Sequence, residues 1–375
     1  MTRREDLAAV LRTILQQFVV DARYVRRNLV GHTLMANKRK ISATVLFSLL
    51  AACAFAQTAT TDPVGFVRKD AAPGYLGLGV PLIISEPFVG AVSSNTGSVV
   101  TFSGTGLNVG STLDAAKPYF LEVLSGPLEG ERIDVSVSAT VSAANATVSL
   151  NLASANNTVT TVAANALATA RCAIREHLTI QRLQGLFSPV LTGNNNPDLA
   201  DKVYLYEGGW VRYNLRGDNV TWRKQLDTVN NYATKVIPPG AGFMVQFVGS
   251  TKTMVNVGKV RTNAFRYNLA TGLQAFALPF PVNMSPVEVG GFVDANDPAG
   301  IRWVGNNNAA AADQLLPYDG GFVRYNLRSD GVTWRKQLDT TNDYANNRFL
   351  APDNVTMIKR TNADSGYLVI RPFSL

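Results

Sequence analysis

The chain offers few side chains that could act as nucleophiles, general bases or metal ligands. Only two of its 375 residues are cysteine and only two are histidine. Cys172 and His177 lie five positions apart in the segment RCAIREHL, so they could form a Cys/His pair. In an alternating strand the two side chains would point to opposite faces, which favours a buried thiol and a surface imidazole. Outside the N-terminal leader, a histidine-based zinc site or a Ser-His-Asp triad would have to rest on His177 alone.

Carboxylates occur in close pairs, but none of these pairs matches a catalytic pattern. The carboxylate separation that glycosidases need cannot be read from sequence distance. The DANDPAG segment at 294–300 has oxygen atoms that could bind calcium, yet it lacks the ligand spacing of an EF-hand, so we expect a plain turn. We therefore predict no catalytic residue, no metal and no cofactor. The pairs are Glu129/Glu131, Asp294/Asp297 and Asp339/Asp343.

Arginine and aromatic side chains recur together in two segments and are the candidate binding residues. Guanidinium groups bind carboxylate and sulfate in a bidentate geometry, and an aromatic ring can stack on a sugar face. We hypothesise that each segment binds an acidic polysaccharide or another envelope polymer. The alternative is a solvated strand face whose arginines pair with Asp227 and Asp339. The candidate residues are Trp210, Arg212, Arg216 and Arg223 in the first segment, and Phe322, Arg324, Arg328 and Arg335 in the second.

These residues belong to a block that the chain contains twice. Residues 208–233 read GGWVRYNLRGDNVTWRKQLDTVNNYA, and residues 320–345 read GGFVRYNLRSDGVTWRKQLDTTNDYA. The copies lie 112 residues apart and differ at five of 26 positions. A duplication of this length predicts two units of the same architecture. It indicates no particular chemistry.

Each block is predicted to form a β-hairpin. Positions 210–216 alternate between apolar and polar residues, as in a strand with one buried face. A two-residue type I′ turn centred on Asp218-Asn219 would set the register. It separates an apolar face, with Trp222 and Trp334 in the core, from a polar face that carries the arginines. The opposed pairs would be Leu215 with Trp222, Tyr213 with Lys224, and Val211 with Leu226.

The first 56 residues are typical of material that an exported chain loses. Three basic residues at 38–40, an apolar run of about 16 residues and a small-x-small ending at 54–56 match a secretory signal peptide. We expect a non-native extension at 1–34, the signal peptide at 35–56 and cleavage before Gln57. Alternatively, Cys53 follows small residues as in a bacterial lipoprotein signal, and its lipidation would anchor the chain to a membrane. The apolar run is too short for a confident transmembrane helix.

Export changes the charge balance. The whole chain has a formal net charge of +8, but nine of its 35 basic and three of its 27 acidic residues lie within 1–56. The remaining 26 basic and 24 acidic residues leave a net charge of about +2. This balance gives no support for nucleic-acid binding. Since Cys172 is then the only cysteine, stability must come from burial of an apolar core rather than from an internal disulfide.

Short apolar runs broken by glycine and proline predict an all-β fold. We expect an N-terminal β domain at 57–170, followed by two related β-sandwich or barrel-like units at 171–259 and 260–375. Each unit would contain one copy of the hairpin. Two such units are too few for a β-propeller.

Three segments together resemble one family. They are the exported start QTATTDPVGFV at 57–67, the segment FLEVLSGPLEGERIDV, and the hairpin followed by a Pro-Gly turn and a strand. These segments are similar to a paralogous family of exported, β-rich, uncharacterised proteins found in Verrucomicrobia. The resemblance covers most of the exported chain and implies export and a bacterial source. Its motifs are structural, so it brings no catalytic residues.

Three classes of function follow from these expectations. We favour an exported, non-enzymatic structural or assembly protein, either extracellular or at the cell surface and outer membrane. The second class is a polysaccharide-binding module that uses the repeated arginine and aromatic faces, with an acidic polysaccharide or another envelope polymer as partner. The third class is a secreted hydrolase. Self-association of the chain would favour the first class, and salt-sensitive binding to anionic polysaccharide would favour the second.

Overall fold

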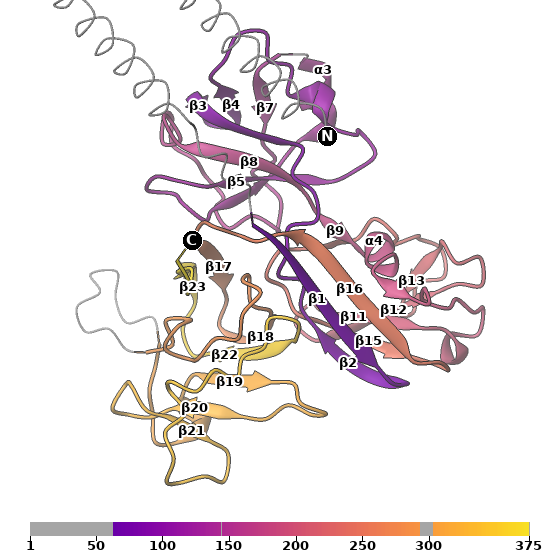
Figure 1. Cartoon of the computed structure of the whole chain (residues 1–375), viewed down its shortest axis with the longest axis vertical. Coiled ribbons are helices and arrows are strands. Elements are labelled where there is room, and N and C mark those ends of the chain that lie inside the picture. The colour runs from indigo at the N-terminus through magenta and orange to yellow at the C-terminus, as the bar shows by residue number, and fades with distance from the viewer. Residues whose placement is uncertain (1–62, 144, 293–302, 375) are drawn as a thin grey trace, which may run out of the picture. The chain divides into compact units, whose positions relative to one another are not determined.

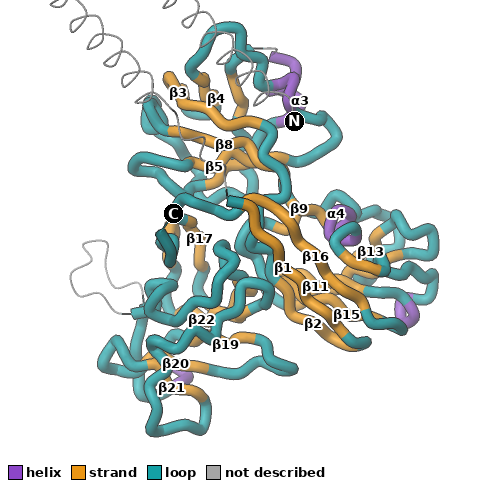
Figure 2. Tube along the Cα trace, viewed as in Figure 1, coloured by secondary structure: helices purple, strands orange, loops and turns teal. Residues whose placement is uncertain are grey.

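The computed structural model describes residues 63–143, 145–292 and 303–374, and the structural statements below concern these residues. Most regular elements are β-strands in antiparallel sheets, which confirms the predicted all-β class (Figures 1 and 2). The expected leader at 1–56, with Cys53, and the DANDPAG segment lie outside the described residues. The helical elements are short: α3 (Val137–Ala143), α4 (Ile180–Gln184), and the 3-10 turns η1 (Gly110–Thr112), η2 (Pro197–Leu199) and η3 (Ala309–Ala311).

The first hairpin belongs to a five-stranded sheet, with a narrow ribbon of strands beside it. The sheet has the order β13 (Trp222–Lys224), β12 (Trp210–Leu215), β11 (Lys202–Tyr206), β15 (Phe243–Phe247) and β2 (Gly74–Leu78). The ribbon has the order β1 (Val64–Ala71), β16 (Lys252–Lys259) and β10 (Phe187–Ser188). The short strands β9 (Leu178–Thr179) and β14 (Val236–Ile237) pair with each other. One apolar cluster, which includes Trp222, joins the sheet to the ribbon.

The second hairpin belongs to a sheet of the same design. Its strand order is β21 (Trp334–Lys336), β20 (Tyr325–Leu327), β19 (Gln314–Pro317), β22 (Thr356–Arg360) and β18 (Gly272–Phe276). The ribbon beside it consists of β17 (Phe265–Leu269) and β23 (Asp364–Val369). Strand by strand, this order repeats that of the first sheet, with β18 in the place of β2. A separate apolar cluster, which includes Trp303 and Trp334, forms the core of this unit.

The strand order reveals a second repeated segment that the hairpin spacing conceals. Residues 66–82 form β1 and β2 of the first unit, and residues 264–280 form β17 and β18 of the second. These segments lie 198 residues apart and share an arginine, an alanine, a glycine and a proline. The shared glycines, Gly74 and Gly272, both have positive φ, at 127° and 94°, which only glycine adopts readily. The repeat therefore begins with this two-strand segment, whose strands pair with later strands and not with each other.

A third β domain interrupts the first unit and accounts for the longer spacing. It lies in the chain between β2 and β9 and forms a six-stranded array with its own apolar cluster. Its order is β6 (Arg132–Asp134), β5 (Tyr119–Val123), β8 (Arg171–Glu176), β3 (Phe88–Thr96), β4 (Val99–Phe102) and β7 (Thr147–Ser149). The expected boundaries at 57 and 171 differ from this pairing, because β1 and β2 join the first unit while β8 joins the inserted domain.

The two hairpins confirm most of the predicted register. Leu215 lies opposite Trp222 and Tyr213 opposite Lys224, with the same pairs in the second copy. Both Trp222 and Trp334 are fully buried, as expected. The expected place of Leu226 was wrong: it is 97% exposed with φ of 67°, because the ladder ends at Lys224 and the chain turns away.

The turn of the first hairpin is wider than the predicted two-residue turn. Arg216 N donates to Thr221 O at 2.9 Å, so four residues form the loop. Asp218 Oδ1 accepts hydrogen bonds from the backbone N–H groups of Val220 and Thr221, which favours this wider loop. Only Asn219 takes positive φ, and Gly331 takes it in the second copy. The exchange of asparagine for glycine therefore falls at the left-handed position.

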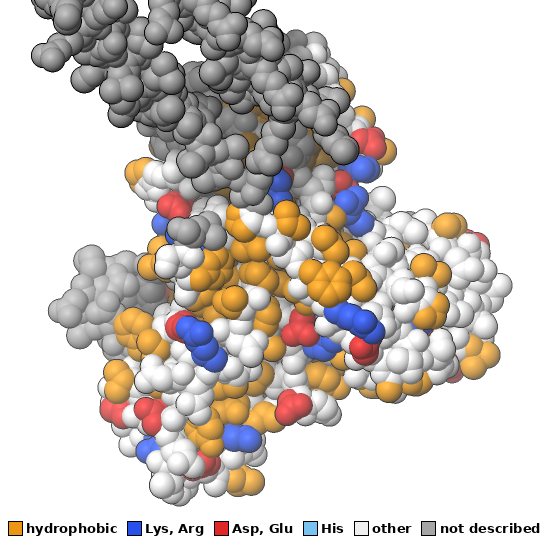
Figure 3. Space-filling model, viewed as in Figure 1, with side chains coloured by type: hydrophobic (Ala, Val, Ile, Leu, Met, Phe, Trp, Pro, Cys, Tyr) orange, Lys and Arg blue, Asp and Glu red, His pale blue; other side chains and the backbone are white. Residues whose placement is uncertain are grey.

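The outward side of the first ribbon carries exposed apolar side chains beside the Arg68–Asp70 ion pair, and β1 is its edge strand. Val64, Phe66 and Val257 are 71%, 63% and 55% exposed. Phe66 and Val257 lie opposite each other on β1 and β16. In Figure 3, apolar side chains gather on the face that includes β1. Among the described residues no strand pairs with the other edge of β1.

No helix within the described ranges is long and apolar enough to span a bilayer.

Candidate functional site

The polar side of each hairpin continues across the neighbouring strands as an outer sheet face. In the first unit, Lys202 on β11 lies opposite Gln246 on β15. In the second unit, Gln314 on β19 lies opposite Lys359 on β22. The lysine and the glutamine have exchanged strands between the copies. Each outer face therefore has one lysine at the same pair of opposed strand positions.

These outer faces carry cations, and the outward positions of their described strands hold no carboxylate. Burial lowers the pKa of Lys202, and the positive charge of Arg212 lowers it further. Two cations so close together favour a bound anion, because an anion relieves their repulsion. The cations on this side of the sheets are Arg212, Arg223 and the buried Lys202 in the first unit, and Arg335 and Lys359 in the second, where Arg324 lies just before β20.

Two of the predicted binding arginines hold a loop of their own unit. Arg216 Nη1 donates to the carbonyl of Asn195 at 3.0 Å, and Arg328 Nη1 donates to the carbonyl of Asn307 at 3.4 Å. These bonds are equivalent in the two copies. Arg223 likewise donates to a carbonyl of the loop that follows its strand. These three side chains therefore stabilise loops, with only part of their donors left for a ligand.

The arginines in the middle of the polar faces have fewer partners. The Nε atoms of Arg212 and Arg324 are buried and have no hydrogen-bond acceptor among the described residues. One Nη atom of Arg335 is also buried without an acceptor among these residues. A buried donor without an acceptor costs about 1–3 kcal/mol, which an anionic oxygen would recover. Arg212 and Arg324 are therefore the strongest binding candidates of the predicted set.

The carboxylates that were expected to pair with the arginines are occupied elsewhere. Asp227 accepts hydrogen bonds from the backbone N–H groups of Val229 and Asn230 and from the hydroxyl of Tyr232. Asp339 makes the same bonds in the second copy. Bonds from the backbone and side chain of Asn230 hold the pKa of Asp227 well below its usual range. The alternative of arginine–aspartate pairs on a solvated face is therefore not what the structure shows.

The two predicted aromatic residues lie against each other. The rings of Trp210 and Phe322 are stacked, with centroids 6.3 Å apart and planes inclined by 18°. Tyr206 packs edge-on against Trp210, and Tyr318 does so against Phe322. Each ring thus already has two aromatic neighbours, which reduces the surface that could stack on a sugar. A more open ring on the outer face is Tyr75, which is 54% exposed.

Each repeated unit contains one buried aspartate that bonds to loops of its own unit. These two residues were not predicted from the sequence. Asp201 accepts from the backbone N–H groups of Thr192 and Val248 at 2.7 and 2.8 Å, and pairs with Lys252 at 3.3 Å. Its counterpart Asp313 also accepts from two backbone N–H groups and lies 3.5 Å from an arginine. Both are fully buried. The one signal in the sequence is that an Asp precedes β11 and β19 at the same spacing of 112.

Cys172 is buried as expected, but the expected surface position of His177 was wrong. Burial raises the pKa of the Cys172 thiol to about 12, so it is not a reactive thiolate. His177 is 2% exposed, and its Nε2 lies 2.6 Å from Asp134 Oδ1. Ser154 donates to the same carboxylate. The serine and histidine thus bond the aspartate from separate sides, which is not the order of a catalytic triad.

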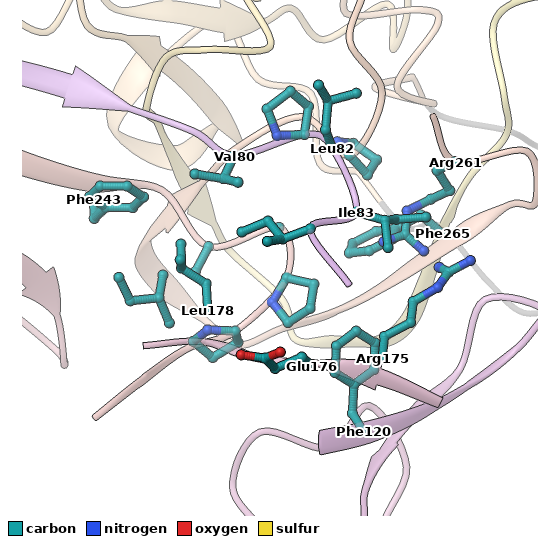
Figure 4. Close-up of a pocket in the computed structure, with 18 residues that line it drawn as sticks. Val80, Leu82, Ile83, Phe120, Arg175, Glu176, Leu178, Phe243, Arg261 and Phe265 are labelled. Atoms are coloured by element: carbon teal, nitrogen blue, oxygen red, sulfur yellow. The ribbon is translucent and has the colours of Figure 1, made fainter. Parts of the chain in front are cut away.

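A small cavity lies where segments of the first unit, the inserted domain and the second unit meet (Figure 4). Its volume is about 50 Å³, enough for one or two water molecules. Aliphatic side chains and prolines form most of its wall, and Arg175 and Arg261 lie at one end beside Phe265. Both guanidinium groups form ion pairs with the fully buried Glu122. Because both guanidinium groups pair with a buried carboxylate, we interpret the cluster as a structural ion-pair network and not as a catalytic site.

Among the described residues, no group of three or more His, Cys, Asp or Glu side chains is placed to hold a metal ion.

Comparison with known proteins gives no family model, no curated protein and no solved structure that matches this chain. The geometry of the chain itself therefore carries the functional argument.

Proposed function

We propose that this chain is an exported, non-enzymatic structural or assembly protein of the cell envelope or extracellular space. The observation that carries the proposal is the use of polar side chains in the two repeated units. In both copies, Asp201 and Asp313, Asp227 and Asp339, and Arg216 and Arg328 bond to loops of their own unit. An active site instead needs acidic, basic or nucleophilic groups that converge on open space.

The export part of this proposal rests on the signal-like segment at 35–56 and on the resemblance to exported β-rich proteins of Verrucomicrobia. Fractionation of producing cells, followed by N-terminal sequencing, tests it. The expected product begins at Gln57 and is recovered outside the cytoplasm, in the envelope or the medium. A chain blocked at Cys53 by lipid would support the anchored form of the same proposal. Full-length chain confined to the cytoplasm would refute export.

Binding of an acidic polysaccharide is the second candidate function, and the outer-face cations favour it. Arg212 and Arg324 have buried donors without acceptors, and neither outer face offers a carboxylate at its outward strand positions. Guanidinium groups satisfy such donors with carboxylate or sulfate oxygens. Retention on immobilised dextran sulfate, but not on neutral dextran, at low salt and its loss at high salt would support this function. Equal behaviour on both supports would refute it.

A further inference from the structure

We infer that the outer faces of the two repeated units form one composite surface for a single acidic polysaccharide chain, instead of two separate sites. The inference rests on the second candidate function above and adds the arrangement of the site. The sequence alone suggests one binding face per copy. The structure brings the two copies of the candidate residues together.

Equivalent positions of the two units contact each other, as they do at an isologous interface. Trp210 stacks on Phe322, its own counterpart 112 residues later. A Cβ atom on Gly79 would lie 2.7 Å from the Cβ atom of Ala277, its counterpart in the repeated two-strand segment. A Cβ atom on Gly242 would likewise overlap the side chain of its counterpart, Val355. These self-equivalent contacts place a local two-fold axis at the junction of the units.

The candidate cations flank this axis symmetrically. Arg212 follows Trp210 by two residues, and Arg324 follows Phe322 by two residues. On β12, residues two apart point to the same side and lie about 7 Å apart, so Arg212 begins about one side-chain length from the aromatic stack. Arg324 lies just before β20, two residues from the other ring of the stack. A polymer that crosses the stack would meet Arg212 and Arg324 in turn.

The charges and rings of this junction match an acidic glycan. Arg212 and Arg324 each keep a buried Nε without an acceptor, and Lys202 lies close enough to Arg212 to lower its own pKa. The rings of Tyr206, Trp210 and their counterparts supply apolar edges between the cations. Carboxylate or sulfate groups would bind the guanidinium groups, while sugar carbons would lie over the aromatic edges.

The test is calorimetric titration of the purified chain with a short sulfated dextran oligosaccharide and, separately, an oligouronate. Arg212→Gln, Arg324→Gln and the double variant are compared with the parent. Arg68→Gln is the matched control, because it removes one exposed arginine that pairs with Asp70 on β1 and belongs to neither outer face. The unfolding midpoint of each variant shows whether it is folded.

We expect one bound oligosaccharide per chain. Arg212→Gln and Arg324→Gln should each weaken binding about tenfold, as loss of one charge-assisted hydrogen bond predicts. The control should change the affinity by less than about twofold, since an exposed charge outside the binding faces is largely screened. The double variant should lose less than the product of the two single effects, because the two arginines act on one ligand.

Two results would overturn the inference in distinguishable ways. Two bound oligosaccharides per chain, with each single variant removing one and leaving the other unchanged, would refute the composite surface and retain polysaccharide binding. No salt-dependent binding of either oligosaccharide by the parent would refute both the inference and the second candidate function.

Discussion

At the scale of single residues, buried charge is used to fasten loops to sheets. Asp201 lies where β11 begins and receives two backbone donors from different loops. Its ion pair with Lys252, which is 1% exposed, connects the five-stranded sheet to the β1–β16 ribbon. Removing such a group lowers the stability of the fold mainly because its former partners stay buried without hydrogen bonds. The bonds themselves contribute less.

Asp201→Ala should destabilise the protein by about 3–5 kcal/mol, because it leaves the ammonium group of Lys252 buried without a counter-charge. Urea unfolding measures the effect. Asp198→Ala, an exposed position on η2 of the same unit, is the control and should shift the midpoint little. Equal effects of the two substitutions would contradict a structural role of Asp201.

Glu207 should make stability depend on acid pH. Burial by itself would raise its pKa, but hydrogen bonds from Lys235, Lys224 and Tyr213 lower it to about 2. A carboxyl group with a lowered folded-state pKa stabilises the fold above its unfolded pKa of about 4.3, and this contribution is lost as pH falls through the folded value. Thermal unfolding should therefore show Glu207→Gln to be less stable than the parent at about pH 6, with the difference shrinking towards pH 2. A difference that is constant with pH would rule out this linkage.

At the scale of elements, glycine permits close contacts that recur in both units. Gly305 is the first residue of the loop GNNN at 305–308, and a Cβ atom there would overlap the carbonyl oxygen of Arg328. Gly193 has the same relation to Arg216 in the first unit. The hairpin turn and the asparagine loop can therefore bond to each other only if this position lacks a side chain.

Gly305→Ala should cost roughly 1–3 kcal/mol, because the added methyl group forces the loop and hairpin apart. Gly321→Ala is the matched control, since a Cβ atom there has no neighbour within 4 Å. Denaturant unfolding of both variants measures the difference. A Gly305→Ala protein as stable as the control would show that the loop can move away without cost.

The edge strand β1 is the element on which self-association would depend. Phe66 is 63% exposed on it and lies among other apolar side chains. We expect Phe66→Ser to reduce self-association in sedimentation velocity, because a second copy pairing at this edge would cover the ring. Val229→Ser removes an exposed apolar side chain from a hairpin loop and should have no effect. Equal association of both variants would exclude β1 as the contact.

Elements were predictable where local pattern decided them. Alternation placed Leu215 opposite Trp222 correctly. The turn was missed because the Asp218 carboxylate, not the backbone preference alone, sets its length. In the candidate site, the cations on the polar face could be listed from the sequence, but their partners could not. Asp227 accepts hydrogen bonds from its own loop, and Trp210 stacks on Phe322. Both contacts depend on the folded chain, so the sequence pattern does not show them.

At the scale of the whole chain, an insertion divides one copy of a duplicated unit. The repeated two-strand segments at 66–82 and 264–280 are weakly similar and lie 198 residues apart, against 112 for the hairpins. A search at one fixed spacing therefore finds only the later pair. The first unit consists of two chain segments, and its eight-residue pairing of β1 with β16 closes it around the inserted domain. Such a unit is a framework that presents surfaces, in agreement with the structural role proposed above.

The measurement that tests this role most directly is the mass of the purified exported chain by light scattering over a hundredfold range of concentration. An assembly protein should form particles much heavier than one chain, whose mass is at most 40.4 kDa, and their mass should rise with concentration. A constant mass equal to that of a single chain across the whole range would contradict the proposal.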